Sequence, residues 1–197
     1  WNGAPGSLAE FGALDRRALV ARQVATVLTE APVVVAGHAF TTGPIKRTTN
    51  EKVLPNTSVE FAMRDGLGCN AAHYTPAELQ GKIVPDEHLH EHATCFNIAG
   101  KGLVVITSCG HAGILNTVAT AREVSGVEKI HALVGGFHLG PAPDAYLNDI
   151  VAQLKTVNPD VVIPMHCSGQ NFIDAVNKTM PEKLLLSTTG ARLTFGA

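Results

Sequence analysis

Three short apolar runs, separated by two amphipathic segments, constrain the fold of this 197-residue chain more than any other feature. The runs span residues 103–106, 131–134 and 161–165. Each intervening segment carries apolar residues at helical spacing, and the two end at Ser125-Gly126 and at Asn158-Pro159. The order strand, helix, strand, helix, strand predicts an α/β fold in which right-handed crossovers make the three strands parallel.

The sequence on either side of this unit predicts a less regular surrounding. Residues 94–99 and 103–106 flank the turn Gly100-Lys101-Gly102, a pattern typical of a β-hairpin. We expect one partial domain over residues 1–197, with 1–80 irregular and loop-rich and with the ordered core in 94–197. The other expected elements are helices at 15–22 and 170–179 and strands at 24–29, 33–36, 59–63, 183–187 and 192–195.

The charge balance argues against nucleic-acid and membrane partners. Charged residues make up 16% of the chain and hydrophobic residues 45%, with a formal net charge of −2. This balance offers no excess of positive charge to bind the phosphate backbone of a nucleic acid or an anionic membrane. No window approaches the ~18 uninterrupted apolar residues of a membrane span. We therefore expect the ligand to be a small molecule.

The cysteines and the first residues bear on the compartment. The four cysteines, at positions 69, 95, 109 and 167, show no CxxC spacing, which favours free thiols in a reducing compartment. Residues 1–7 lack the basic and apolar regions of a signal peptide, and the first residue is not methionine. We expect a cytoplasmic protein whose chain begins mid-protein; an exported precursor that has lost its leader is the alternative.

A histidine follows each of the three parallel strands. His111 comes after the first, His138 after the second and His166 after the third. The carboxyl ends of parallel strands lie along one edge of a sheet, where ligands bind, so the topology predicts that the three histidines converge. Imidazole is the commonest metal ligand and is suited to proton transfer near neutral pH. A single histidine would be read as an ordinary side chain, but three at equivalent strand ends favour a functional site.

The residues around these histidines resemble successive motifs of a known family. Residues 107–116, 134–139 and 164–169, together with 42–47 and 85–87, are similar to motifs of the metallo-β-lactamase superfamily. The resemblance is to the branch that includes the ribofuranosylaminobenzene-phosphate dihydropterin synthase-like proteins, and it runs from about residue 38 to the C-terminus. It implies an α/β fold, a four-layer αββα sandwich, with one or two divalent metal ions. The metal is usually zinc, with manganese or iron as alternatives.

The resemblance also assigns roles to the three histidines. It implies that His111 and His166 are metal ligands. Many relatives carry a bridging aspartate where this sequence has Gly136-Phe137-His138, so His138 is expected to be a catalytic residue that contacts substrate or transfers a proton. The family's opening motif, His-x-His-x-Asp-His, does not occur in this chain. The resemblance therefore implies the carboxy-terminal part of the sandwich, without the part that supplies half of the metal site.

Other side chains near these motifs are candidates for supporting roles. We expect Lys46 and Arg47 to meet an anionic substrate group, with an exposed basic pair as the alternative, and Phe137 to contact substrate. Packing behind the ligands is the expected role of Cys109 and Cys167, with thiolate ligation of zinc as the alternative. The residues expected to orient the ligands from behind are Thr107, Ser108 and Asn116.

A second histidine cluster, His88, His90 and His92, lies upstream of the hairpin. In an extended segment the three side chains would share one face and could hold zinc. Their acidic neighbours favour a solvated polar loop instead. We therefore expect this segment to be a solvated polar loop, with a tri-histidine zinc site as the alternative.

Together these features predict a metal-dependent hydrolase. A bound ion lowers the pKa of water from 15.7 toward ~7 for attack on an ester, amide or phosphoester bond, and His138 would protonate the leaving group. Two other classes stay open, a non-catalytic remnant of the fold and one subunit of a split enzyme. We expect the isolated chain to be inactive, with a second chain or a homo-oligomer covering an apolar sheet face that is otherwise bare.

Overall fold

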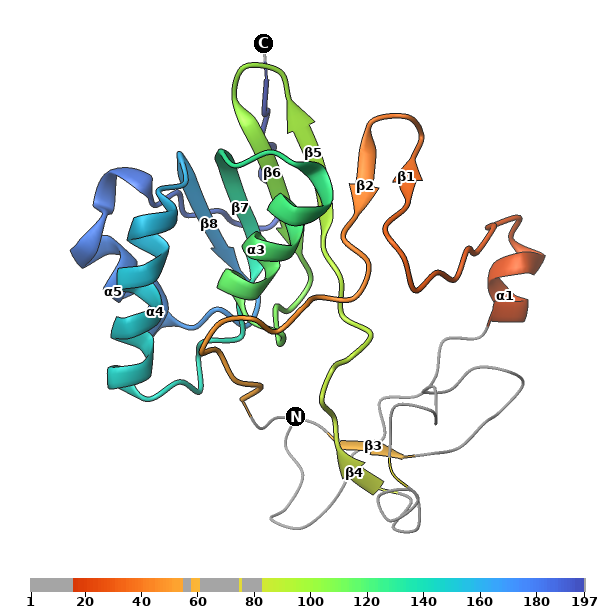
Figure 1. Ribbon diagram of the computed structural model, residues 1–197, viewed down its shortest axis with the longest axis horizontal. Coiled ribbons are helices and arrows are strands. Elements are labelled where there is room, and N and C mark those ends of the chain that lie inside the picture. Colours follow the sequence, from red (N-terminus) through yellow and green to blue (C-terminus); the bar gives the residue numbers. More distant parts are fainter. Residues whose placement is uncertain (1–15, 55–57, 61–74, 76–82, 197) are drawn as a thin grey trace. The chain divides into compact units, whose positions relative to one another are not determined.

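The computed structural model describes residues 16–54, 58–60, 75 and 83–196, and the chain divides into two compact units (Figure 1). One unit comprises Trp1–Leu28 and Thr57–Asp86. Its described elements are a short helix α1 (Arg16–Ala21) and the antiparallel pair β3 (Ser58–Glu60) and β4 (Ile83–Pro85). The other unit, Thr29–Asn56 with Glu87–Ala197, contains everything described below.

A six-stranded sheet forms the centre of the second unit, in the order β1-β2-β5-β6-β7-β8. Strands β5 and β6 form the expected antiparallel hairpin, and β6, β7 and β8 are parallel to one another. The sequence therefore predicted both the hairpin and the parallel unit correctly. The strands are β1 (Val34–Val35), β2 (Ala39–Thr41), β5 (Thr94–Ile98), β6 (Gly102–Thr107), β7 (Ile130–Gly136) and β8 (Val161–Met165).

Three helices follow the parallel strands, as expected: α3 (Ile114–Ser125), α4 (Asp144–Val157) and α5 (Gln170–Thr179). Helix α3 ends because Gly126 adopts a left-handed conformation, with φ of 69°, and Asn158 ends α4 in the same way. A single 3₁₀ turn, η2 (Pro181–Lys183), follows α5. Figure 1 shows the three helices gathered beside the parallel part of the sheet.

Alternate residues of the sheet face two different cores, as the two-residue period of a strand requires. Leu103 and Val105 belong to the larger core, which the helices cover with side chains such as Leu147 and Phe172. Val104, between them, belongs to a smaller core on the opposite face. In α4 the buried residues repeat at helical spacing: Leu147, Ile150, Val151 and Leu154.

The smaller core is covered by the chain's own last residues. Leu193 and Phe195 pack against it, and Ala132 and Ile163 are completely buried. The expectation of a bare apolar face is therefore not met at the centre of this face. Whether a second chain joins the surrounding surface stays a prediction.

Several strands expected outside the parallel unit do not form. Residues 192–195 have no strand partner, because their apolar side chains lie across the smaller core instead of extending the sheet. Residues 183–187 make only one bridge, Leu184 with Val162, since the 3₁₀ turn occupies Lys183. Residues 24–29 are also irregular, and their side chains at Val27 and Leu28 are exposed. Part of the strand expected at 59–63 lies outside the described residues.

None of the helices in the described parts of the chain is both long enough and apolar enough to cross a membrane.

The carboxyl ends of β6, β7 and β8 lie close together at one edge of the sheet. Gly136 closes β7 between the other two strands. A Cβ atom there would lie 2.5 Å from the carbonyl oxygen of Ser108 and 2.9 Å from the sulfur of Cys167. Only glycine lets the three strand ends approach this closely.

Candidate functional site

Two of the three histidines that follow the parallel strands have strained backbone conformations. His138 and His166 have positive φ angles of 45° and 50°, and His88, upstream of the sheet, has 48°. These are three of the six described non-glycine residues with positive φ. Such conformations cost of order 1 kcal/mol or more for residues with a Cβ atom, and they gather at functional sites. The backbone strain therefore coincides with the histidines.

Three imidazole rings are in contact at this edge of the sheet. The rings of His88 and His111 are stacked, with centroids 3.7 Å apart and an angle of 9° between their planes. The ring of His138 lies against His111, with centroids 4.4 Å apart. The sequence predicted that His111, His138 and His166 would converge. His111 and His138 are in ring contact, whereas His166 lies near His138 and beside Cys109 and Cys167. His88 joins the cluster from a segment that precedes the hairpin.

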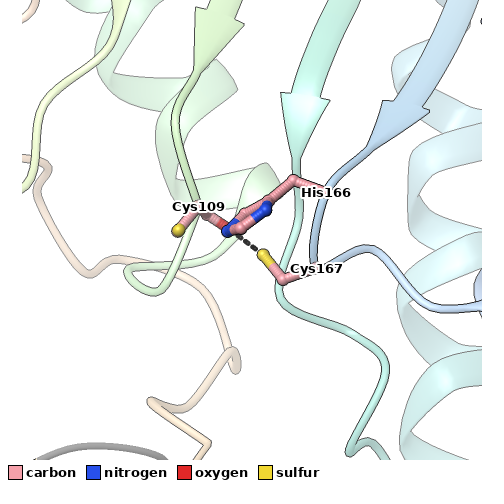
Figure 2. A group of neighbouring side chains, drawn as sticks. All are labelled: Cys109, His166 and Cys167. Carbon is pink, nitrogen blue, oxygen red and sulfur yellow. Dashed lines mark hydrogen bonds between the residues drawn. The ribbon is translucent and has the colours of Figure 1, made fainter. Parts of the chain in front are cut away.

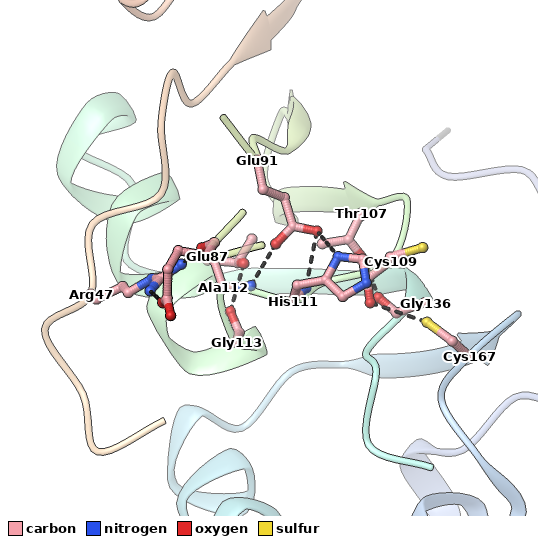
Figure 3. A network of polar contacts seen from close by, with 11 residues as sticks. Arg47, Glu87, Glu91, Thr107, Cys109, His111, Ala112, Gly113, Gly136 and Cys167 are labelled. Carbon is pink, nitrogen blue, oxygen red and sulfur yellow. Dashed lines mark hydrogen bonds and ion pairs between the residues drawn. The ribbon is translucent and has the colours of Figure 1, made fainter. Parts of the chain in front are cut away.

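The carboxylate of Glu91 holds His111 in place (Figure 3). It accepts hydrogen bonds from the backbone N–H groups of His111, at 3.0 Å, and Ala112, at 2.5 Å. Its Oε1 also lies 3.2 Å from Nδ1 of His111. A proton on Nδ1 would be donated to Glu91, which would fix the tautomer that carries its lone pair on Nε2.

These contacts determine the charge of Glu91. Its side chain is only 9% exposed, and burial by itself would favour the neutral acid. The hydrogen bonds from the His111 side chain and from the backbone of Ala112 and His111 outweigh that effect and lower the pKa of Glu91 to about 2. The site therefore contains a carboxylate that is ionised across the physiological range.

The ring of His138 has two buried nitrogens. Neither Nδ1 nor Nε2 has a hydrogen-bond partner among the described residues. Burial, together with the nearby His111, His88 and His166, lowers the pKa of His138 to about 4. A neutral imidazole offers one N–H donor and one lone pair, so this side chain can exchange a proton with a group that enters the site, or hold an ion there.

His166 lies close to the thiols of Cys109 and Cys167 (Figure 2). The potential ligand atoms of Cys109, His166 and Cys167 all lie within 4.8 Å of one another. The Cys167 thiol donates a hydrogen bond to the carbonyl oxygen of Cys109, with 3.3 Å between the atoms. Burial, reinforced by Cys167, raises the pKa of the Cys109 thiol to about 11.

A set of buried polar groups fixes the loops that carry these side chains. The hydroxyl of Thr107 donates to the carbonyl oxygen of Gly136 at 2.7 Å, which ties β6 to the end of β7. The hydroxyl of Ser168 donates to the carbonyl oxygen of Met165 at 2.7 Å and accepts from the N–H of Phe137 at 3.2 Å. Ser168 thus joins the loop after β7 to the loop after β8.

The first turn of helix α3 takes its hydrogen-bond acceptor from another segment, because its N-cap residue, Gly113, has no side chain. The buried carboxylate of Glu51 supplies the missing acceptor and takes the N–H of Asn116 at 2.9 Å. The Asn116 side chain in turn accepts the N–H groups of Thr48 and Thr49, each at 2.8 Å. Asn116 therefore positions the segment before Glu51 and makes no contact of its own with the imidazoles in the described contacts.

The remaining sequence candidates lie as follows. Lys46 pairs with Glu123 of α3, and Arg47 pairs with Glu87 (Figure 3). Ser108 is exposed, and its carbonyl oxygen accepts the N–H of Gly136 at 3.2 Å. The side chain of Phe137 is 2% exposed, and its ring packs edge-on against Phe172 in the core. The ring of Phe137 thus has a packing role, and a substrate contact for it, or for the two cations, stays a prediction.

The interpretation of residues 88–92 as a solvated loop is wrong for two of them. His88 is 7% exposed and the Glu91 side chain 9%, whereas His90 and His92 are exposed. A turn, in which the N–H of Glu91 donates to the carbonyl oxygen of His88, prevents the three histidines from sharing one face. The alternation of histidines suggested an extended segment. The residue that reaches the site is instead Glu91, which lies between His90 and His92 and binds His111.

A small pocket adjoins the histidine cluster. Its lining includes His111, His138 and Tyr146, whose hydroxyl accepts the N–H of Lys52 at 2.9 Å.

Comparison with known proteins gives matches in sequence and in structure. No family model matches the chain. The chain is similar over 89 residues, 45% of its length, to two proteins of Methanocaldococcus jannaschii. One, 29% identical, is 7,8-dihydropterin-6-methyl-4-(β-D-ribofuranosyl)-aminobenzene-5′-phosphate synthase; the other, 42% identical, bears the name Uncharacterized protein MJ0448. The matched regions cover 30% and 31% of these two proteins.

The structure also superposes on a solved structure. That structure is Tm1679, a metal-dependent hydrolase of the β-lactamase superfamily, with a TM-score of 0.65 and 23% sequence identity. The superposition covers 87% of this chain and 59% of the other. The chain therefore spans about a third of the length of the curated relatives and less than two thirds of this structural neighbour.

Proposed function

We propose that this chain, which has part of the metallo-β-lactamase fold and resembles the dihydropterin branch in sequence, forms the metal-binding edge of a hydrolase. The observation that carries the proposal is His138, whose two buried ring nitrogens have no partner among the described residues, beside His111, whose ring is held by Glu91. Buried polar groups of this kind are rarely left unsatisfied, so the arrangement favours a bound ion or substrate.

In the proposed site His111 and His166 hold a divalent ion, with zinc as the favoured metal. Glu91 orients His111 by accepting its Nδ1 proton, which would place the lone pair of the ring on Nε2. When bound, such an ion polarises a substrate oxygen and makes hydroxide available near neutral pH. His138 stands beside His111 and is positioned to move a proton to the leaving group.

The proposed substrate is a small anionic molecule with a hydrolysable ester, amide or phosphoester bond. Lys52 is among the residues that line the pocket beside His111 and His138, and its positive charge favours an anionic group there. One relative is named as the synthase of a 5′-phosphate compound, which favours a phosphorylated substrate here as well.

A second candidate function is a synthetic reaction, because that same relative is a synthase. The same residues would then bind and orient two reactants without water attack. Incubating the assembly that completes the metal site with phosphate esters alone, and then with a phosphorylated aminobenzene riboside and a pterin donor, separates the two. Turnover only in the second mixture would replace hydrolysis with synthesis.

The metal site is also proposed to be incomplete in this chain. Catalytic zinc usually has three protein ligands, and two are assigned here. The remaining ligands would come from another polypeptide or from further sequence of a longer protein.

The test is zinc binding by the chelator-treated chain, measured by equilibrium dialysis. Replacing His111 with alanine should weaken zinc binding by ~10-fold or more, in the range of lost ligands and their supports. His131→Ala is the matched control, because His131 lies at the opposite end of β7 and pairs with Asp160. Equal zinc affinity in His111→Ala and His131→Ala would contradict the proposal.

His138→Ala is tested separately for its assigned role. It should retain zinc in this assay and lose ~10²–10⁴-fold in turnover in the assembly that hydrolyses substrate. Loss of zinc as large as in His111→Ala would show that His138 is a ligand instead of a proton-transfer residue.

A further inference from the structure

We propose that Cys109, His166 and Cys167 form a binding site for a thiophilic divalent ion of the zinc class. The ion would be held by two thiolates and one imidazole, with its fourth coordination position open to solvent. The inference rests on the proposed function in one respect, because both take His166 as a metal ligand. It adds two ligands from this chain and moves the ion toward the carboxyl ends of β6 and β8.

The distances allow such a site with small movements. The three potential ligand atoms lie within 4.8 Å of one another. In a tetrahedral zinc site with Zn–S of ~2.3 Å and Zn–N of ~2.0–2.1 Å, neighbouring ligand atoms lie roughly 3.3–3.8 Å apart. Rotation of the cysteine side chains about χ1 covers a difference of this size. Figure 2 shows the three side chains gathered where β6 and β8 end.

The backbone holds the two cysteines at this separation. Cys109 follows β6 and Cys167 follows β8, and Gly136 of the intervening β7 keeps them close. A Cβ atom at position 136 would lie 3.0 Å from the Cα of Cys109 and 2.9 Å from the sulfur of Cys167. Ser168 fixes the second loop through its bond to Met165. The two thiols are therefore brought together by the sheet and not by a flexible segment.

The chemistry of the donor set points to a soft ion. Two thiolates and one imidazole with an open fourth position are one of the ligand sets of catalytic zinc, and thiolates select against magnesium and calcium. Exposure also fits ligation, since His166 is exposed and the two thiols are partly so. Cys95 offers the contrast within the same chain: it is fully buried in the larger core, where a thiol serves only to pack.

Cobalt(II) is the probe that tests this site. The whole chain is treated with chelator, kept reduced with a phosphine and titrated with Co²⁺. Thiolate ligands give a charge-transfer absorption in the near ultraviolet that imidazole and carboxylate ligands do not, while any tetrahedral site gives visible bands. All variants carry Cys69→Ala. Cys95→Ala is the matched control, and far-ultraviolet circular dichroism verifies folding of each variant.

The proposal predicts near-ultraviolet absorption that saturates at one Co²⁺ per chain and is unchanged in Cys95→Ala. Cys109→Ser and Cys167→Ser should each remove about half of it, and the double variant all of it, because each thiolate contributes one ligand. Zn²⁺ should displace the cobalt and abolish the signal.

Failure of this inference and failure of the proposed function give different spectra. Visible bands without near-ultraviolet absorption, lost in His111→Ala, would leave the histidine site standing and overturn the thiolate site. Near-ultraviolet absorption that persists in Cys109→Ser/Cys167→Ser would also overturn it. Thiolate absorption that is lost in the double variant and intact in His111→Ala would support this site and contradict the role of His111. Absence of any cobalt spectrum would overturn both.

Discussion

Replacing Glu91 with glutamine should destabilise the metal-free chain by about 3 kcal/mol near neutral pH. The carboxylate accepts two backbone N–H groups and faces Nδ1 of His111. Glutamine has the same shape but keeps a single acceptor oxygen, and its NH₂ group would face a donor. Hydrogen bonds to charged groups contribute about 1.5–3 kcal/mol each, so losing one and straining another gives this magnitude.

The lowered pKa of Glu91, which arises from the same hydrogen bonds, leads to a similar figure. It falls from 4.5 to about 2 on folding, and each unit corresponds to about 1.4 kcal/mol, which gives roughly 3 kcal/mol. Because the pKa is lowered in the folded state, this stability is fully present above pH 4.5 and is lost as the pH falls toward 2. The difference between the wild type and Glu91→Gln should therefore shrink through this acid range.

The assay is urea denaturation followed by circular dichroism at pH 7 and at two acid pH values. Glu87→Gln is the control, since the side chain of Glu87 is 52% exposed and its pair with Arg47 should contribute at most about 1 kcal/mol. A Glu91→Gln chain within about 0.5 kcal/mol of the wild type at pH 7 would refute the reasoning. A deficit that does not shrink in acid would show that shape, and not charge, is what glutamine disturbs.

Two further substitutions test the framework of the site. Gly136→Ala should lower the free energy of unfolding by about 2 kcal/mol or more and weaken Co²⁺ binding, because the new Cβ would lie 2.5 Å from the carbonyl oxygen of Ser108. Unchanged thermal unfolding and unchanged cobalt titrations would contradict this close packing. Asn116→Ala should cost about 2–4 kcal/mol, because the N–H groups of Thr48 and Thr49 lose their acceptor, and hydrogen exchange at these two amides should rise; protected amides would count against it.

The parallel unit was predictable because each of its signals is local. Helical spacing, the terminating Gly126 and Asn158, and apolar runs of strand length all lie within a few residues, and the structure confirms the elements they predict. The comparisons agree with the resemblance: the fold matches that of a metal-dependent hydrolase of the β-lactamase superfamily, and 89 residues are similar to a dihydropterin synthase. Residues 192–195 misled because an alternating apolar pattern fits a segment lying across a sheet as well as a strand within it.

The candidate site was predictable in its location but not in its full membership. Topology alone brings His111 and His138 together. Glu91 and His88 arrive from a turn before the hairpin, and no spacing rule relates them to the ends of the parallel strands. The one available signal was the need for an acceptor at the N–H groups of His111 and Ala112, and the sequence does not say which acidic residue supplies it.

Anomalous X-ray diffraction from crystals of the chain soaked in zinc tests the central claim most directly. The account predicts a zinc peak at the carboxyl ends of β6, β7 and β8, with ring nitrogens of His111 and His166 about 2.0–2.1 Å from zinc. A zinc peak displaced toward the sulfurs of Cys109 and Cys167, with His166 still a ligand, would further support the thiolate site. A strand edge free of anomalous density at saturating zinc, or zinc bound only at the exposed His90 and His92, would contradict the account.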